Sequence, residues 1–262
     1  MTAIGQTFDK CKAEGRLAFM PFLTAGDPDV ATTVAAIGRL MSAGVDLIEV
    51  GFPYSDPIAD GPTIQASYTR ALNNEVRVTD IFEGLAGVGE DAPPRIAMVS
   101  YAIIFRHGVE TFCERAKSAG VSGLIVPDLP GTDAEETAAA VRGAGLDLIQ
   151  LVAPTTPRER SAEIVRNCSG FVYCVAVAGI TGERAQVADA LHDQLRWLRE
   201  ETDLPLAVGF GISKPEHVAD LRGVADGVIV GSGIVRRMEG GGEAALDAVE
   251  SFAKEMAAAC RA

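Results

Sequence analysis

Residues 46–65 read DLIEVGFPYSDPIADGPTIQ, and this stretch decides both the fold and the place of the chemistry. It begins as a short apolar strand that contains Glu49 and is interrupted at Pro53, since proline has no N–H group for a sheet ladder. A carboxylate inside an apolar strand is costly unless it is paired or its pKa is raised. We therefore expect chemistry at Glu49 and in the loop that follows, which carries Asp56 and Asp60.

Seven further apolar runs alternate along the chain with segments of helical spacing. Most runs are apolar at consecutive positions, which is typical of parallel strands covered on both faces. The eight runs are residues 17–24, 46–50, 95–101, 123–126, 146–152, 171–177, 206–209 and 227–230. Asp27, followed by Pro28, is predicted to cap the helix after the first run.

Eight strands alternating with helices predict an α/β fold, a single-domain (β/α)8 TIM barrel over residues 1–262, although a doubly wound sheet gives the same alternation. Residues 2–14 add an N-terminal helix, and a short helix is expected after the eighth strand. In such a barrel the reactive groups lie at the carboxyl ends of the strands. Glu49 and Asp60 fall at that position in and after the second strand.

Composition excludes several classes of protein. The formal charge of −13 argues against nucleic acid or an anionic membrane as a partner. No run of about 18 apolar residues and no signal-peptide pattern is present, so we expect a cytoplasmic protein. Five cysteines without a CxxC pair predict reduced, mostly buried thiols.

Three glycine-containing turns each follow one of the last three apolar runs. They are residues 178–182 (AGITG), 209–213 (GFGIS) and 231–233 (GSG), and the short helix expected at 234–238 comes next. Each alone is equally well a tight turn. Together they predict a phosphate site, because glycines let backbone N–H groups approach an anion and barrel phosphate sites form after strands 7 and 8.

The two acids also have ordinary interpretations. Glu49 could belong to a structural ion pair, and Asp60 could be a turn residue beside Gly61, as Asp56 is beside Pro57. As a pair in different surroundings, Glu49 and Asp60 could be held at different pKa values. No lysine ends a strand, no histidine adjoins a nucleophile and no zinc spacing exists. The residues thus predict an acid/base site with a phosphate anchor and no metal.

Residues 21–28 (PFLTAGDP) and 49–65 carry a resemblance to a known family, which continues through residues 127–130 (PDLP) and the glycine turns. The chain resembles the tryptophan synthase alpha chain family over essentially its whole length. The resemblance implies a lyase that cleaves indole-3-glycerol phosphate into indole and glyceraldehyde 3-phosphate. It also implies an α2β2 complex with a beta chain, which receives the indole. No cofactor is expected in this chain, and pyridoxal phosphate only in the beta chain.

The resemblance also implies roles for single residues. Glu49 would supply and then remove protons, Asp60 would hold the ring N–H as a carboxylate, and Tyr173 matches the active-site tyrosine. Pro53 and Asp56 match the surface that meets the beta chain. The substrate-binding positions are Phe22 and Tyr101 at the indole wall, Thr181 in the lid, and Gly182, Gly211, Gly231 and Ser232 around the phosphate.

Two stretches depart from the family pattern, and two other functions stay open. Residues 102–108 lack an asparagine that is usual there, and residues 175–177 lack a common serine. One alternative is a related barrel enzyme resembling indole-3-glycerol-phosphate synthase, which is expected to use a lysine at a strand end. The other is a catalytically silent activator of a beta chain.

Overall fold

The structure of the protein is a computed structural model that describes residues 1–57, 60–89, 91–176, 184–209 and 211–262. Its strands form one sheet in the order β5-β4-β3-β2-β1-β9-β8-β7-β6, and every hydrogen-bonded pair of described strands is parallel. The strands are β1 (Ala18–Thr24), β2 (Ile48–Gly51), β3 (Arg95–Met98), β4 (Val121–Ile125), β5 (Asp147–Ile149), β6 (Leu151–Val152), β7 (Val172–Val175), β8 (Leu206–Gly209) and β9 (Gly227–Val230).

The sheet closes on itself at Gln150. The first and last strands in the order, β5 and β6, are consecutive in the chain and are separated by this one residue. Both lie in the single apolar run predicted at residues 146–152, so they act as one broken strand and the sheet has eight positions. The predicted (β/α)8 barrel is confirmed, since each of the eight runs contributes to the sheet.

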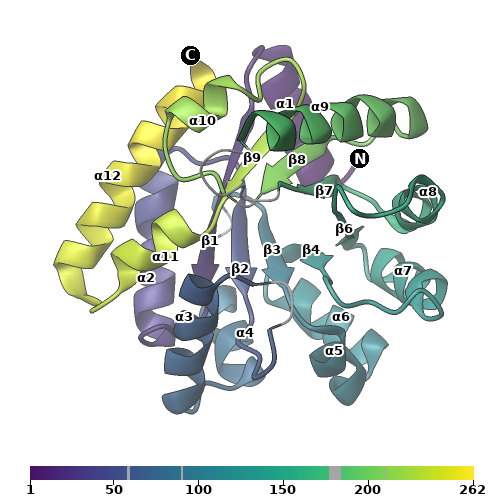
Figure 1. Ribbon diagram of the computed structural model, residues 1–262. Coiled ribbons are helices and arrows are strands. Elements are labelled where there is room, and N and C mark those ends of the chain that lie inside the picture. The colour runs from purple at the N-terminus through teal and green to yellow at the C-terminus, as the bar shows by residue number, and fades with distance from the viewer. Residues whose placement is uncertain (58–59, 90, 177–183, 210) are drawn as a thin grey trace.

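Helices surround the strands, as Figure 1 shows. One of them, α1, is the expected N-terminal addition, and α11 is the expected short helix after the last strand. The helices are α1 (Ala3–Ala13), α2 (Val30–Ala43), α3 (Pro62–Asn73), α4 (Val78–Ala86), α5 (Tyr101–His107), α6 (Val109–Ser118), α7 (Ala134–Gly143), α8 (Arg158–Asn167), α9 (Arg184–Glu201), α10 (Glu216–Ala219), α11 (Ser232–Met238) and α12 (Gly242–Arg261).

The buried apolar side chains form two separate clusters. The larger lies between strands and helices, and the smaller lies inside the barrel. Helix α1 closes the end of the barrel at which the strands begin, because Ile4, Phe8 and Cys11 belong to the inner cluster. The Phe8 ring lies 5.5 Å from that of Phe171, between their centroids. The interior near α1 is therefore a packed core, and the cavity that contains Glu49 lies toward the other end.

Two local expectations are wrong. Asp29 caps α2, since its side chain accepts a hydrogen bond from Thr32 N, whereas the predicted cap Asp27 is buried and binds Arg70 through both carboxylate oxygens, at 3.0 and 2.7 Å. The run at 95–101 was predicted to be strand throughout, but β3 ends at Met98.

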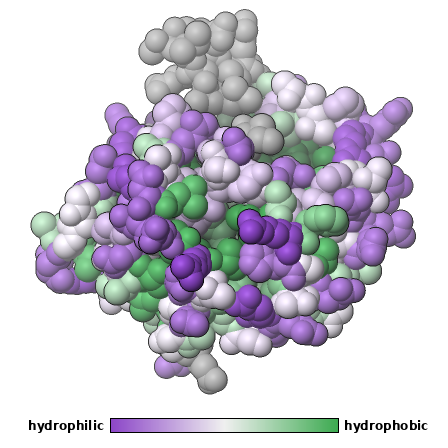
Figure 2. All heavy atoms as spheres, turned by 90° about the horizontal axis from the view of Figure 1, so that it is seen from below, coloured by the Kyte–Doolittle hydropathy of each residue, from purple (hydrophilic) through white to green (hydrophobic). Residues whose placement is uncertain are grey.

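The outer surface is mainly hydrophilic on the face seen in Figure 2, with smaller apolar areas among hydrophilic side chains. None of the described helices is both long and apolar enough to cross a membrane. All five cysteines are free and buried, as predicted.

Candidate functional site

A cavity of about 360 Å³ opens at the carboxyl ends of the strands. It brings together seven of the residues that the sequence singled out, from β1, β2, β7, the loop before α3, and the turns after β8 and β9. These seven are Phe22, Glu49, Asp60, Tyr173, Gly211, Gly231 and Ser232. Thr181 and Gly182 lie outside the described residues.

Glu49 is the buried carboxylate of this cavity. Alternation along β2 turns it inward, with Phe22 on β1 and Ile96 on β3 as its register neighbours. The residue is 1% exposed, and neither carboxylate oxygen has a hydrogen-bond partner among the described residues. Burial, assisted by the charge of Asp60, raises the pKa of Glu49 from 4.5 to about 8. The side chain therefore keeps its proton at neutral pH, and no described residue forms the structural ion pair considered for it.

Asp60 is the second acid, and it is held in place at both ends of its loop. Phe52 anchors the start, with its ring 5.3 Å from that of Phe82. At the other end, Gln65 Nε2 donates a hydrogen bond of 2.8 Å to the Asp60 carbonyl oxygen, and Pro62 begins α3. Burial raises the pKa of Asp60 from 3.8 to about 6. Two carboxyl groups that face one cavity thus differ in protonation near pH 7.

Tyr173 reaches the cavity because glycine stands opposite its ring. A Cβ at Gly209 on β8 would overlap the Tyr173 hydroxyl group. A second close approach exists at Gly51 on β2, where a Cβ would overlap the Phe22 ring. Burial raises the pKa of Tyr173 well above its ordinary value, so the phenol stays protonated. These two glycines give the barrel wall the space in which aromatic side chains face the acids.

Tyr68 is a site residue that the sequence reasoning missed. It lies on α3, is 3% exposed, and belongs to the inner cluster with Ile64 of the same helix. Its pKa is raised well above the ordinary value by burial and by the charges of Asp60 and Glu49. The signal in the sequence was the spacing of four between Ile64 and Tyr68, which directs both side chains to the helix face next to the acid loop.

The glycine turns after β8 and β9 also line the cavity. Gly211 has φ +75°, a conformation that side chains rarely adopt. Gly231 precedes α11, whose first residue is Ser232. The side chain of Arg236, one turn further along α11, also lines the cavity. This arrangement offers backbone N–H groups, a hydroxyl group and a guanidinium to an anion.

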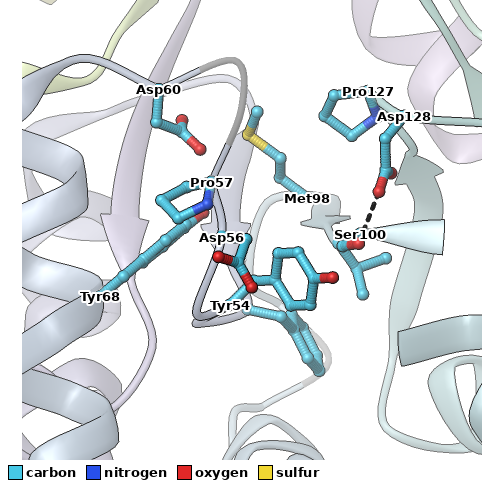
Figure 3. A pocket seen from close by; sticks show the side chains of 11 residues that line it. Tyr54, Asp56, Pro57, Asp60, Tyr68, Met98, Ser100, Pro127 and Asp128 are labelled. Atoms are coloured by element: carbon cyan, nitrogen blue, oxygen red, sulfur yellow. Dashed lines mark hydrogen bonds between the residues drawn. The ribbon is translucent and has the colours of Figure 1, made fainter. Parts of the chain in front are cut away.

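A second cavity of about 270 Å³ adjoins the first and shares Asp60 and Met98 with it. Figure 3 shows this neighbour, with Asp56, Tyr68 and Asp60 around it. Asp56 is exposed, whereas Pro53 is buried within the chain.

Tyr101 does not line either cavity. It is the first residue of α5, where its N–H donates to Asp128 Oδ1 at 2.7 Å. The hydroxyl of Ser100 accepts a hydrogen bond from Ala102 N as the cap of the same helix. Capping therefore places Tyr101 in a helix and not in the predicted strand, and its ring packs near that of Phe105, 6.0 Å away. Its place at the indole wall, implied by the resemblance, stays a prediction.

Metal binding and thiol chemistry find no support in the part of the chain that the structure describes. No three His, Cys, Asp or Glu side chains there are grouped so that they could hold a metal ion. Burial raises the pKa of every cysteine thiol, which makes thiolates scarce near pH 7. The chemistry that the described cavity offers is proton transfer beside groups that can bind an anion.

Comparison with known proteins agrees over nearly the full length. The family model described as "Tryptophan synthase alpha chain" matches residues 8–261. The tryptophan synthase alpha chain of Rhodopirellula baltica is 47% identical and covers 99% of this chain and 96% of its own. That of Synechocystis is 46% identical, with 98% of each chain covered.

Solved structures agree as well. A chain of Mycobacterium tuberculosis tryptophan synthase in its aminoacrylate-bound form superimposes with a TM-score of 0.89 at 35% identity, covering 99% of this chain and 100% of its own. A mutant alpha subunit from Pyrococcus furiosus gives 0.84 at 36% identity, covering 93% and 99%.

Proposed function

The chain belongs to the tryptophan synthase alpha chain family, and from this premise we propose that it is a lyase that cleaves indole-3-glycerol phosphate into indole and glyceraldehyde 3-phosphate by acid/base catalysis. One observation carries the proposal. A buried, protonated Glu49 and a more acidic Asp60 face the same cavity as the glycine turns at Gly211 and Gly231. The reaction needs one carboxyl group that is protonated and can donate its proton, and a second that stays ionised, and two acids with different pKa values provide both.

The first step is protonation of the indole ring. The Glu49 carboxyl group gives its proton to ring carbon C3, which becomes tetrahedral and leaves a positive charge at the ring nitrogen. The Asp60 carboxylate accepts a hydrogen bond from the ring N–H and stabilises that charge. Because Glu49 has a pKa of about 8, it is protonated at neutral pH, whereas Asp60 with a pKa of about 6 is mainly ionised.

The second step breaks the carbon–carbon bond. Glu49, now a carboxylate, removes the proton of the hydroxyl group on the side-chain carbon attached to C3. The electrons of the C3–carbon bond return to the ring, the aromatic indole forms, and the side-chain carbon becomes the aldehyde of glyceraldehyde 3-phosphate. Glu49 ends the cycle protonated, as it began. The Tyr173 hydroxyl group lines the same cavity and, in this proposal, orients the ring.

The phosphate group is assigned to the turns after β8 and β9. Gly211, Gly231 and Ser232 lie on the side of the cavity where backbone N–H groups can reach an anion. Gly182 and Thr181 extend this assignment by resemblance alone. A phosphate held there fixes the glycerol chain and so presents C3 to Glu49.

We further propose that a beta chain docks beside the second cavity, near Asp56, in an α2β2 complex. Asp56 is exposed there, and the cavity shares Asp60 with the reaction site. The indole product passes to that partner, which holds the pyridoxal phosphate, and this chain needs no cofactor of its own. The buried Pro53 contributes to this surface by shaping the loop rather than through contact.

The test is the formation of indole from indole-3-glycerol phosphate, with and without a beta chain. Glu49→Gln should lower the rate at least about a hundredfold, since a positioned proton donor contributes roughly 10²–10⁴-fold. Binding of glycerol 3-phosphate should stay near normal, because glutamine keeps the shape. Glu255→Gln, an exposed carboxylate on α12, is the matched control.

Two outcomes would contradict the proposal. Near-normal turnover by Glu49→Gln would remove the acid/base assignment. A wild-type chain that releases no indole, yet accelerates a beta chain, would be the silent activator instead. An enzyme resembling indole-3-glycerol-phosphate synthase would form the substrate of this assay rather than consume it.

A further inference from the structure

The cavity has an uneven distribution of charge. Its described lining carries two acids, Glu49 and Asp60, and one cation, Arg236. The protein as a whole has a formal charge of −13. Glu49 is protonated near pH 7, so Asp60 is the acid that repels a phosphorylated substrate and Arg236 is the one side-chain cation of the described lining that attracts it.

Two adjacent arginines on α11 are placed differently. Arg236 lies on the same helix face as Ser232, four residues earlier, and its side chain is exposed at the cavity. The guanidinium of Arg237 lies 3.7 Å from the centre of the Phe252 ring and donates to Gly233 O at 2.7 Å. Arg237 is thus packed onto α12, and Arg236 is left to face the site.

The Arg236 side chain is hydrogen-bonded to Ser232, the serine that we assign to the phosphate site. Its Nε donates to Ser232 O at 3.1 Å, and its Nη2 donates to Ser232 Oγ across a longer 3.4 Å. Because the oxygen of the hydroxyl group accepts here, its hydrogen stays available to donate to a ligand. Several N–H groups of the guanidinium stay available as well. Both donors can therefore converge on one anion beside Gly231.

We propose that Arg236 selects phosphorylated substrates over their unphosphorylated counterparts, by pairing its guanidinium with the phosphate next to Ser232. The inference rests on the function proposed above and names a specificity residue for it. Backbone N–H groups and a hydroxyl carry no net charge, whereas an arginine offers a fixed charge and a planar fork that fits phosphate oxygens. Arg236 contacts substrate in this role but takes no part in proton transfer.

The experiment compares a charged ligand with an uncharged one that has the same ring. Binding of indole-3-propanol phosphate and of indole-3-propanol is measured by calorimetry on wild type, Arg236→Met, Arg236→Lys and Arg237→Met. We expect Arg236→Met to weaken the phosphate ester about tenfold, the scale of one charge-assisted hydrogen bond at a partly exposed site. The alcohol should bind within about twofold of wild type, because it lacks the group that Arg236 recognises.

The other variants separate charge from structure. Arg236→Lys keeps the charge and should recover most, but not all, of the affinity, since the fork is lost. Arg237→Met removes the same charge one residue along and should bind both ligands like wild type. In wild type, added salt should weaken the phosphate ester and leave the alcohol unchanged, and Arg236→Met should lose most of that salt dependence.

Three results would overturn the inference. Arg236→Met could bind the ester as tightly as wild type, or it could weaken ester and alcohol equally, as a purely structural role in α11 requires. A wild-type affinity for the ester that ignores salt would contradict it without any variant. If wild type cleaves indole-3-glycerol phosphate and Arg236→Met has an unchanged KM, only this inference fails. If wild type binds no phosphate ester, the proposed function fails with it.

Discussion

Replacing Glu49 by glutamine should change how the stability of the protein depends on pH. In the unfolded chain this carboxyl group titrates near 4.5, and in the fold burial raises its pKa to about 8. Below about pH 4.5 the group is protonated in both states and contributes nothing to the difference. Between the two values the unfolded chain loses the proton and the native protein keeps it, so stability falls as pH rises.

The expected size of this effect follows from the pKa values. At 1.36 kcal/mol per pKa unit, a rise from 4.5 to about 8 corresponds to about 5 kcal/mol of stability lost once both states are ionised. At about pH 7 the loss is about 3 kcal/mol by the same slope. Folded domains have roughly 5–15 kcal/mol in total, so the effect is large enough to measure. Glutamine is neutral at every pH and should not show it.

The assay is urea unfolding of wild type and Glu49→Gln at a series of pH values from about 5 to about 9. The two proteins should have similar stability at the acid end, and the variant should become the more stable by several kcal/mol at the alkaline end. Asp60 titrates in both proteins, so comparison of the two removes most of its contribution. Glu255→Gln, on the surface of α12, should run parallel to wild type. Parallel curves for Glu49→Gln would show that the carboxyl group is not held protonated by burial.

The rate of indole release should rise and fall with pH, because Asp60 must be ionised and Glu49 protonated. The limbs of kcat/KM should lie near pH 6 and pH 8, and a flat profile across that range would refute the assignment. In Gly209→Ala the new methyl group overlaps the Tyr173 hydroxyl. We expect a loss of about 1–3 kcal/mol in unfolding free energy with a lower kcat, while Gly38→Ala, where a Cβ meets nothing, should lose neither. The five buried cysteines should react with a thiol reagent far more slowly in the folded protein than in guanidinium, and rapid labelling of any one without denaturant would show that a thiol is accessible.

Much of the site could be predicted because barrel geometry follows from chain order. Once the runs are read as parallel strands, Glu49 must point inward at the carboxyl end of β2, and the turns after β8 and β9 must face it. The pairing of Phe22 with Glu49 across β1 and β2 came from the structure, since the sequence offered Phe22 only through the family resemblance. The chemistry of an isolated acid in an apolar strand is likewise a local signal.

Other features depended on contacts between distant parts of the chain. Tyr101 continued an apolar run. Its N–H, however, donates a hydrogen bond to Asp128, which follows the next strand, and a helix begins at Tyr101. Asp27 looked like a cap, and a partner 43 residues away, Arg70, makes it a buried ion pair instead. The spacing of Ile64 and Tyr68 indicated a shared buried face of α3, but the packing that sets this face against the acid loop could not be read from helix periodicity. Such choices are decided by partners that the local sequence does not contain.

Helix α1 affects where small molecules can enter and leave the barrel. Its side chains occupy the amino end of the barrel, and the rings of Phe8 and Phe171 are too close there for a bicyclic compound to pass. In the part of the chain that the structure describes, the cavity with Glu49 opens at the carboxyl ends of the strands, and we expect the reactant and both products to pass there. A protein that takes up the indole is therefore expected to bind at the carboxyl end of the barrel and not beside α1.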